Sequence, residues 1–488
     1  MITDELVFHI EKHFAHVPTA EQRQAMQQFS RFMTSRDDHA AFILRGSAGT
    51  GKTTLAAAIV QTLLTLKQKL VLLAPTGRAA KVLSLIASHP AYTIHRRIYR
   101  QRSAADLSAF NLNDNLHADT LFIVDEASMI GDHGSDGTST LSFGSGSLLD
   151  DLVRYVYSGT RCRLMLIGDA AQLPPVGEPL SPALSADVLS AYGLRVHEAD
   201  ISEVLRQAQA SGILCNATAV RSLISGGNAA VMPKVCLAGF TDVTVVPGDE
   251  LIEQLASSYS HAGLDDTIVI TRSNKRANIY NQGVRRTILD REDELCRGDQ
   301  LMIVKNNYHW TQPTPGGSPA DAQQSSALPF LANGDRCIVQ RVRNRREQHG
   351  FRFADVTLSF PDYDDTELTA TVLLDTLTTD APALTREQQQ QLFDSVMADY
   401  ADIPLKADRM KAVRQDPFYN ALQVKFAYAV TCHKAQGGQW AHVYLDQGYI
   451  PDDTAPDDYL RWLYTAITRA TARLFLVNWP QSQIEAAT

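Results

Sequence analysis

The segment Gly46–Thr53, with the sequence GSAGTGKT, has the residue types and spacing that hold a nucleoside triphosphate. It fits the pattern G-x-x-x-x-G-K-[ST], in which glycines let backbone N–H groups close around phosphate oxygens. In that pattern Lys52 reaches the β- and γ-phosphates, and the hydroxyl of Thr53 holds Mg²⁺. The residues expected to contact the nucleotide are Gly46, Ala48, Gly49, Thr50, Gly51, Lys52, Thr53 and Thr54.

Acidic residues and a glutamine follow two apolar runs downstream of this loop. Asp125 and Glu126 follow LFIV, and Asp169 and Gln172 follow RLMLIG. Asp125 is predicted to hold Mg²⁺ through its water shell, and Glu126 to orient and deprotonate the attacking water. The amide of Gln172 can donate or accept a hydrogen bond, so it is suited to sense the γ-phosphate as it leaves. Together these segments predict hydrolysis of ATP.

The elements that must position these residues alternate in type along the chain. Apolar runs typical of buried strands are followed by longer stretches typical of helices. In the first region the expected strands are AAFILRG, KLVLLAPT, TLFIVDEA and RCRLMLIGD. In a second region the expected strands are TDVTVVPG, TIVITRSN, HVYLDQGY and ARLFLVNW. This alternation predicts an α/β fold with parallel sheets flanked by helices.

Three segments interrupt the alternation. Residues 131–148 are rich in Gly and Ser and predict a mobile loop, and residues 311–329 predict a flexible linker or insertion. Residues 336–424 have a different texture, with three strand patterns followed by two helical patterns. That segment is expected to form a small β-domain with a helical projection.

Composition narrows the class of protein without deciding its partner. A length of 488 residues favours two or more domains, and the sequence has no unbroken apolar run of about 18 residues, so no membrane span is expected. The six cysteines are scattered singly, which argues against a zinc site or a disulfide framework and favours the cytoplasm. The net charge of −9 does not exclude nucleic acid, because a motor needs only a local basic channel.

Further motifs, in a fixed order, resemble those of superfamily 1 DNA helicases of the RecD/Dda-like branch. The segment Thr19–Ala25 resembles the family's adenine-reading segment, which assigns Gln22 to the base. APTGRAAKVL and TIHR resemble two motifs that contact single-stranded DNA. The DNA-contacting residues that these two motifs assign are Pro75, Thr76, Arg78, Thr93 and His95.

Motifs in the second half resemble those that complete the family's ATP site. EVLRQ places Arg206 where the family has an arginine that contacts the γ-phosphate, and LYTAITRA places Arg469 as a second arginine finger. Such cations stabilise transition-state charge only when the cleft closes. AYAVTCHKAQGGQW resembles the fifth motif, with two residues toward the DNA, Thr431 and His433, and two nearer the nucleotide, Gln436 and Gly437.

The resemblance implies two RecA-like lobes that hold ATP and Mg²⁺ between them and move 5′→3′ along single-stranded DNA. The expected division is lobe 1 at 1–200, lobe 2 at 201–335 and 425–488, and an SH3-like β insertion with a helical arm at 336–424. The arm is expected to brace lobe 1, with a partner-docking role as the alternative. Only a short segment precedes Gln22, which resembles the compact Dda type.

Residues Arg97–Asp119 are expected to form a small hairpin insertion that separates the strands. An aromatic residue in this region is more often part of a core, but three side chains are candidates for stacking on bases: Tyr99, Phe110 and His433. The expected partners are single-stranded DNA and duplex junctions, with single-strand-binding or recombination proteins, and the chain is expected to be a monomer.

Three functions remain open from the sequence. The first is an autonomous helicase acting in DNA replication, recombination or repair. The second is a motor subunit of a recombination or nuclease complex whose partner supplies the nuclease. The third is an ATP-dependent switch without unwinding activity. An RNA substrate also stays open, because motors that track a backbone do not necessarily reject a 2′-hydroxyl.

Overall fold

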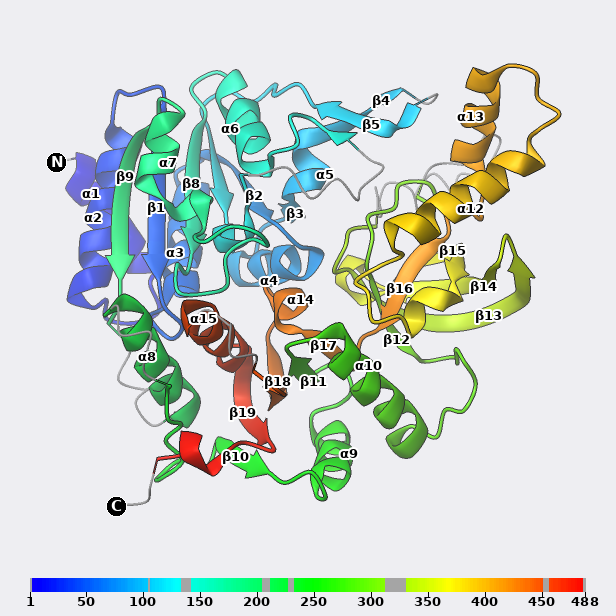
Figure 1. Cartoon of the computed structure of the whole chain (residues 1–488). Coiled ribbons are helices and arrows are strands. Elements are labelled where there is room, and N and C mark those ends of the chain that lie inside the picture. Colours follow the sequence, from blue (N-terminus) through cyan, green and yellow to red (C-terminus); the bar gives the residue numbers. More distant parts are fainter. Residues whose placement is uncertain are drawn as a thin grey trace.

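The protein folds as two parallel β-sheets flanked by helices, with a closed barrel beside them (Figure 1). The predicted α/β class with two RecA-like lobes is therefore confirmed. The computed structural model describes residues 2–103, 106–132, 142–203, 211–226, 232–311, 331–450 and 456–485.

Lobe 1 is built on a six-stranded parallel sheet of order β3-β2-β6-β8-β1-β9. Its central strands are buried on both faces, as expected for near-continuous apolar runs in a parallel sheet. The strands are β1 (Ala40–Gly46), β2 (Lys69–Ala74), β3 (Ala91–Thr93), β6 (Thr120–Val124), β8 (Arg163–Gly168) and β9 (Arg195–Ile201).

Helices cover both faces of the lobe 1 sheet and make two separate apolar cores. One core lies under α1 (Ile2–His13), α2 (Ala20–Thr34), α3 (Lys52–Thr65) and α4 (Gly77–Ala87). The other lies under α5 (Ile94–Ile98), α6 (Leu148–Ser158) and α7 (Ala186–Ala191). Because both faces are covered, ligands can reach the sheet only at the ends of its strands.

The expected hairpin insertion of lobe 1 is formed by the antiparallel strands β4 (Tyr99–Ser103) and β5 (Asp106–Leu112). A short strand, β7 (Ser142–Phe143), pairs in parallel with β5. The end of the segment 131–148 is therefore part of this small sheet, where the Gly and Ser content predicted only a mobile loop. Residues 133–141 of that segment lie outside the described residues.

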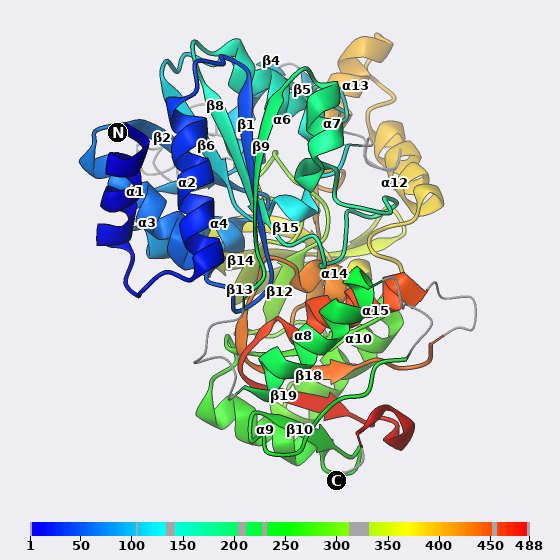
Figure 2. The ribbon, with the colours of Figure 1, turned by 90° about the vertical axis from the view of Figure 1, so that its left-hand side faces the viewer.

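Lobe 2 has a five-stranded parallel sheet of order β10-β19-β18-β11-β17. The strands are β10 (Val243–Val246), β11 (Thr267–Thr271), β17 (Ala429–Thr431), β18 (Trp440–Asp446) and β19 (Ala470–Val477). The helices on one face are α8 (Gly212–Ser225), α14 (Cys432–Ala435) and α15 (Pro456–Ile467). Those on the other are α9 (Leu251–His261) and α10 (Asn274–Gly283). Figures 1 and 2 both place α8, α14 and α15 at the boundary with lobe 1.

The third unit is a closed five-stranded barrel that shares an apolar core with α9 and α10. Its strands are β12 (Gln300–Ile303), β13 (Arg336–Gln348), β14 (Phe351–Phe360), β15 (Thr366–Leu373) and β16 (Leu422–Phe426). The range 336–424 thus omits β12 and cuts β16. The sequence hid β12 because it is only four residues long and lies more than 30 residues before β13. Residues 312–330, which hold nearly all of the predicted linker, lie outside the described part.

The helical projection consists of α12 (Arg386–Asp399) and α13 (Lys406–Gln415). It packs on the barrel through an apolar cluster in which Leu392, Val396 and Val413 meet Phe353 of β14. The barrel therefore positions the arm, and bracing of lobe 1 by the arm stays a prediction.

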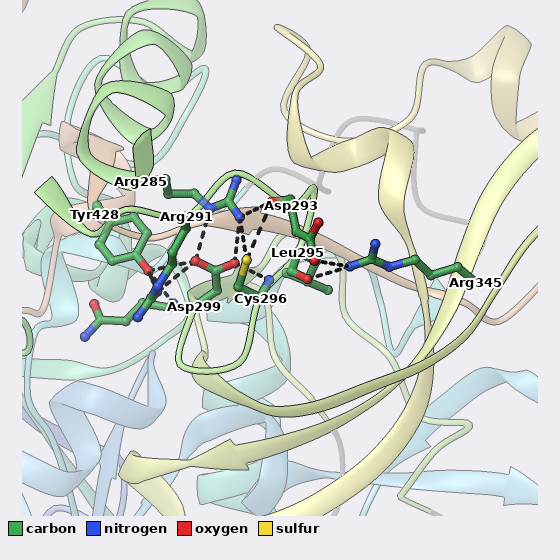
Figure 3. A network of polar contacts seen from close by, with 9 residues as sticks. Arg285, Arg291, Asp293, Leu295, Cys296, Asp299, Arg345 and Tyr428 are labelled. Atoms are coloured by element: carbon green, nitrogen blue, oxygen red, sulfur yellow. Dashed lines mark hydrogen bonds and ion pairs between the residues drawn. The ribbon is translucent and has the colours of Figure 1, made fainter. Parts of the chain in front are cut away.

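A buried carboxylate joins the barrel to lobe 2. Asp299 is fully buried and accepts hydrogen bonds from Arg285 at 3.0 Å, from Arg291 at 2.9 Å and from the Tyr428 hydroxyl at 3.0 Å (Figure 3). These partners come from the segment after α10 and from the chain between β16 and β17. Because losing one partner of such a buried pair costs several kcal/mol, Asp299 fixes where the chain enters and leaves the barrel.

Within the described segments, no helix has the length and apolar character needed to cross a membrane.

Candidate active site between the lobes

The phosphate-binding loop connects β1 to α3, as its sequence pattern predicts. Gly49 and Gly51 have φ angles of 76° and 80°, a left-handed region that glycine enters without steric cost. Gly46 ends β1 beside β9, where an added Cβ would lie 2.5 Å from Cγ1 of Ile201. Glycine is therefore required at these positions for the loop to take this shape.

The loop backbone also holds the Lys52 ammonium group, and the residues after it begin α3. The Nζ of Lys52, the first residue of α3, donates to the carbonyl oxygens of Gly46 at 2.5 Å and Ser47 at 2.9 Å. Thr50 is buried, and its hydroxyl donates to Ser47 O at 2.8 Å. Thr53 and Thr54 follow in the first turn of α3, at a helix N-terminus that favours phosphate.

Gln22 lies under this loop, and its surroundings do not match a free adenine reader. Its side chain is 1% exposed, its Nε2 donates to Thr50 O at 2.8 Å, and its Oε1 accepts from the Thr19 N–H. Thr19 and Gln22 form a capping box that starts α2. In this conformation Gln22 supports the loop from within, and a base can contact it only after a local rearrangement.

Asp125 and Glu126 end β6, next to the loop. Burial and the neighbouring Glu126 charge raise the pKa of Asp125 to about 6, while Lys52 acts in the opposite direction. Glu126 has a φ of 52°, which is strained for a residue with a side chain and is typical of functional sites. A half-buried carboxylate with this raised pKa fits a cation ligand, because a bound cation favours the charged form.

The second acidic strand end, after β8, carries Asp169 and Gln172. Asp169 is buried, and its Oδ1 accepts from the Ala171 N–H at 3.0 Å. The side chain of Gln172 is 5% exposed, and its Oε1 has no hydrogen-bond partner among the described residues. An unpartnered buried acceptor at the end of β8 is suited to hold a water molecule by one of its protons.

Lobe 2 meets this edge of lobe 1 through α15 and the segment after α14. The Leu173 N–H donates to Thr465 Oγ1 at 2.8 Å, and Gln436 Nε2 donates to Leu173 O at 2.7 Å. Gly437 has a φ of 72°, and a Cβ there would lie 3.1 Å from Oγ1 of Thr76. The predicted residues Gln436 and Gly437 thus lie at the lobe boundary.

The predicted arginine finger Arg469 does not contact the loop in this conformation. Arg469 is 2% exposed and donates to Thr465 O at 3.0 Å and to Gly438 O at 3.2 Å, both in its own lobe. Arg206 lies outside the described residues. A different lobe 2 arginine, Arg221 of α8, donates to Ser47 Oγ at 2.7 Å. No sequence motif assigned a role to Arg221, and only the folded structure shows that it contacts the phosphate-binding loop.

The first predicted DNA-contacting motif also lies at the lobe boundary. Pro75 and Thr76 precede α4, and the Thr76 hydroxyl accepts from the Ala79 N–H as its N-cap. Arg78 Nη2 donates to Gln439 O at 2.5 Å, and its guanidinium lies 4.3 Å from the Trp440 ring centre. Burial lowers the pKa of Arg78 to about 10. In this conformation Arg78 binds lobe 2, which differs from its predicted DNA contact.

The residues of the second predicted DNA-contacting motif make contacts within lobe 1. Thr93 is buried, and its hydroxyl accepts from the Arg96 N–H as the N-cap of α5. Burial lowers the pKa of His95 to about 4, so this side chain is neutral and cannot attract a phosphate by charge. The Tyr99 hydroxyl donates to Asp151 Oδ2 at 2.6 Å, which anchors the hairpin to α6, and stacking of its ring on a base stays a prediction. The side chain of Phe110 lies outside the described residues.

A cationic pocket lies where α10, β17 and α14 meet β16. Thr431 and Asn274 line it, and the predicted residue His433 is exposed beside it. The Nζ of Lys434 is buried with no hydrogen-bond partner among the described residues. Burial and the nearby Lys425 charge lower the pKa of Lys434 to about 7, and burial lowers that of Lys425 to about 8. Sequence reasoning missed both lysines, although Lys434 directly follows His433.

Comparisons with known proteins match the two halves of this site. Residues 18–233 match the family model of an AAA domain, and residues 426–477 match that of a UvrD-like helicase C-terminal domain. Over 167 residues the chain is 31% identical to the ATP-dependent RecD2 DNA helicase of Deinococcus radiodurans. That match covers 34% of this chain and 20% of the relative, so the chain spans about a fifth of that protein's length.

Similar solved structures include Pif1 helicases. One, from a study of DNA unwinding at forked DNA by two coordinating Pif1 helicases, has 15% identity and a TM-score of 0.46, covering 97% of this chain and 95% of that chain. Another, Pif1 from Bacteroides with ADP-AlF3 and single-stranded DNA, has 15% identity and a TM-score of 0.45 at the same coverage. The chain therefore combines an AAA domain with a UvrD-like helicase C-terminal domain, and part of it is similar to a RecD2 helicase.

Proposed function

We propose that this chain is an ATP-driven helicase that moves 5′→3′ on single-stranded DNA and opens duplexes, in DNA replication, recombination or repair. The observation that carries the nucleic-acid part is the pocket around Lys434. A buried ammonium group without a partner is costly, and an anion that enters removes that cost. Asn274, Thr431 and Lys425 add polar and cationic groups suited to a backbone phosphate.

The hydrolytic part rests on the loop and its two carboxylates. Lys52 would exchange its loop carbonyls for phosphate oxygens, and Glu126 would take a proton from the attacking water that Gln172 holds. Mg²⁺, held by Thr53 and Asp125, would neutralise phosphate charge. Arg469 is held within lobe 2 by hydrogen bonds to Thr465 and Gly438, so its contribution would arise only as these bonds break and the lobes move.

Movement would follow from the contacts that join the lobes. Gln436 and Thr465 of lobe 2 hold Leu173, which follows the γ-phosphate-sensing Gln172 directly. A change at the γ-phosphate would therefore shift lobe 2, and with it the pocket around Lys434. Alternating grip on the backbone by the two lobes would convert this shift into steps.

The test is ATP-dependent unwinding of two matched duplexes, one with a 5′ single-stranded tail and one with a 3′ tail, with Lys52→Ala as the control. Opening of the 5′-tailed duplex alone is expected. Opening of the 3′-tailed duplex alone would keep the motor and reverse its direction. Opening of neither, with hydrolysis still stimulated by single strands, would favour a translocase or a motor subunit that needs its partner. Hydrolysis that ignores single strands would favour a switch.

The same measurements address the remaining partners. A monomer is proposed to suffice, so unwinding should not depend steeply on protein concentration. An RNA strand with the same tail would test whether a 2′-hydroxyl is tolerated.

A further inference from the structure

The hydroxyl of Tyr464 joins three parts of the lobe boundary. Tyr464 lies on α15 of lobe 2, and its hydroxyl accepts a hydrogen bond from the Ala48 N–H of the phosphate-binding loop at 3.0 Å. The same hydroxyl donates to Asp169 Oδ2 at the end of β8, at 2.5 Å. One oxygen of lobe 2 therefore bonds both lobe 1 segments that flank the expected γ-phosphate.

The two hydrogen bonds, and not packing, account for a hydroxyl group at Tyr464. Tyr464 is 1% exposed, and a buried hydroxyl is costly unless its hydrogen bonds are made. Burial and the Asp169 charge raise the pKa of Tyr464, so the hydroxyl keeps its proton and donates it toward the carboxylate. A phenylalanine would fill the same space and leave the Ala48 N–H and Asp169 without this partner.

We propose that Tyr464 is a positioning residue for hydrolysis, which fixes Gln172 and the phosphate-binding loop relative to α15. This inference rests on the proposed function for its reaction and adds a residue that no sequence motif assigned. The path to Gln172 is short, because the Gln172 N–H donates to the Asp169 carbonyl at 3.2 Å. The carboxylate that Tyr464 holds thus belongs to the same turn as the side chain that would hold the water.

The position of α15 gives the same hydroxyl a second effect. Thr465, the next residue, holds the Leu173 N–H, and Arg469 follows five residues after Tyr464. Without the hydroxyl, α15 would keep its apolar packing but would lose its direct bond to the loop that contacts the nucleotide. Rearrangement of Arg469 would then no longer be tied to the state of that loop.

The test compares Tyr464→Phe with Tyr459→Phe, which removes a hydroxyl from the same helix. Tyr459 is also buried, but its hydroxyl donates to Gln447 Oε1 at 2.8 Å within lobe 2. Steady-state ATP hydrolysis is measured with and without an oligo(dT) strand. Tyr464→Phe is expected to lower kcat about tenfold, the scale of one hydrogen bond to a charged group, with the KM for ATP within about twofold. Tyr459→Phe should keep the wild-type kcat.

A double-mutant cycle with Asp169→Asn approaches the contact from the other side. If the two groups act as one unit, the double variant should hydrolyse no more slowly than the slower single variant. Thermal unfolding of each variant checks that the fold is kept. A Tyr464→Phe enzyme with wild-type kcat, or losses that simply multiply in the double variant, would overturn the positioning role.

The outcomes separate this inference from the proposed function. If oligo(dT) does not stimulate the wild type but Tyr464→Phe still lowers basal kcat, the positioning role stands and the DNA motor is overturned. If oligo(dT) stimulates both enzymes to the same kcat, the motor stands and the positioning role is overturned. A wild type that hydrolyses no ATP would overturn both.

Discussion

The phosphate-binding loop of lobe 1 and the cationic pocket of lobe 2 both present a lysine for a phosphate, but they hold it differently. Lys52 donates to two loop carbonyls, so its ammonium has partners before any ligand arrives. The Nζ of Lys434 is buried without a partner in the described chain, and Lys425 repels it. The lysine of the first site therefore has hydrogen-bond partners without its ligand, whereas the described chain offers none to Lys434.

The two sites therefore differ in what a bound phosphate would change. At the loop, a nucleotide replaces hydrogen bonds that already exist, so binding is an exchange of partners. At the pocket, a phosphate supplies the missing charge, so binding is expected to change the protonation of the protein itself. Variants of the loop should therefore affect turnover, whereas variants of the pocket should affect affinity and its dependence on pH and salt.

The largest expected effect is at the loop. Lys52→Ala should abolish ATP hydrolysis and unwinding while the fold is kept, because the cation that neutralises the phosphates is lost. Hydrolysis is measured by phosphate release, and folding by thermal unfolding. Lys67→Ala, an exposed lysine shortly after α3, is the matched control and should behave as the wild type. Normal hydrolysis by Lys52→Ala would remove the whole site assignment.

Arg469 should have the next largest effect. Like Lys52, it has hydrogen-bond partners before any ligand arrives, and these partners lie within its own lobe. Arg469→Ala should bind ATP but lower kcat by about 10²–10³-fold, the scale of losing one transition-state donor. Binding is followed with a fluorescent ATP analogue and turnover by phosphate release. Arg473→Ala, an exposed arginine on β19, serves as the control. Unchanged turnover in Arg469→Ala would exclude it as an arginine finger and direct attention to Arg221.

The sequence predicted the lobe 1 sheet and its strand-end residues well, for a physical reason. The loop that binds phosphate needs glycines and a lysine in one short segment, and its flanking strand and helix are local in the chain. Eight strands of the two parallel sheets were also expected as apolar runs, whereas the short or partly polar strands β3, β9 and β17 were not predicted. These features depend on neighbours in sequence, so a single sequence can reveal them.

The missed features depend on contacts between distant segments. Tyr464 reads as one more apolar residue in α15, and only the docking of lobe 2 brings its hydroxyl to Ala48 and Asp169. In the sequence Lys434 looks like a surface lysine, and only the packing of α10 and β16 near it shows that its Nζ is buried. The motif placed Arg78 in the chain but could not show its contacts with Gln439 and Trp440, because a motif does not give the conformation of the cleft.

A smaller effect is expected at the pocket. Lys434→Met removes one cation while keeping a flexible stem of similar length, and should weaken binding of an oligo(dT) strand roughly three- to tenfold. Fluorescence anisotropy at several salt concentrations should also give a salt slope shallower by about 0.7, the value for one phosphate of a single strand. Lys275→Met, an exposed lysine on α10, is the control. An unchanged slope in Lys434→Met would mean that no phosphate enters this pocket.

The pH dependence of the same affinity is the smallest and most specific expected effect. In the free protein the pKa of Lys434 is about 7 and that of Lys425 about 8, and a bound phosphate raises both. The complex therefore holds more protons than the free protein above pH about 7, so affinity is full below that pH and falls as the pH rises. Between pH 7 and 8.5 the charged fraction of Lys434 falls roughly fifteenfold and that of Lys425 about fourfold, so a loss of affinity of at least about tenfold is expected.

Other groups near the pocket should not mask this change. Arginines stay charged across the range, and partial desolvation by neighbouring groups lowers the pKa of His433, so this side chain is neutral above pH 7. The charge of Asp380 acts on Lys425 in the opposite direction to burial and raises its pKa. Lys434→Met should flatten most of the fall, whereas Lys275→Met should keep it. If wild-type affinity stays constant from pH 6.5 to about 9, Lys434 is not recharged by its ligand, and the two lysine sites differ in structure but not in how they bind.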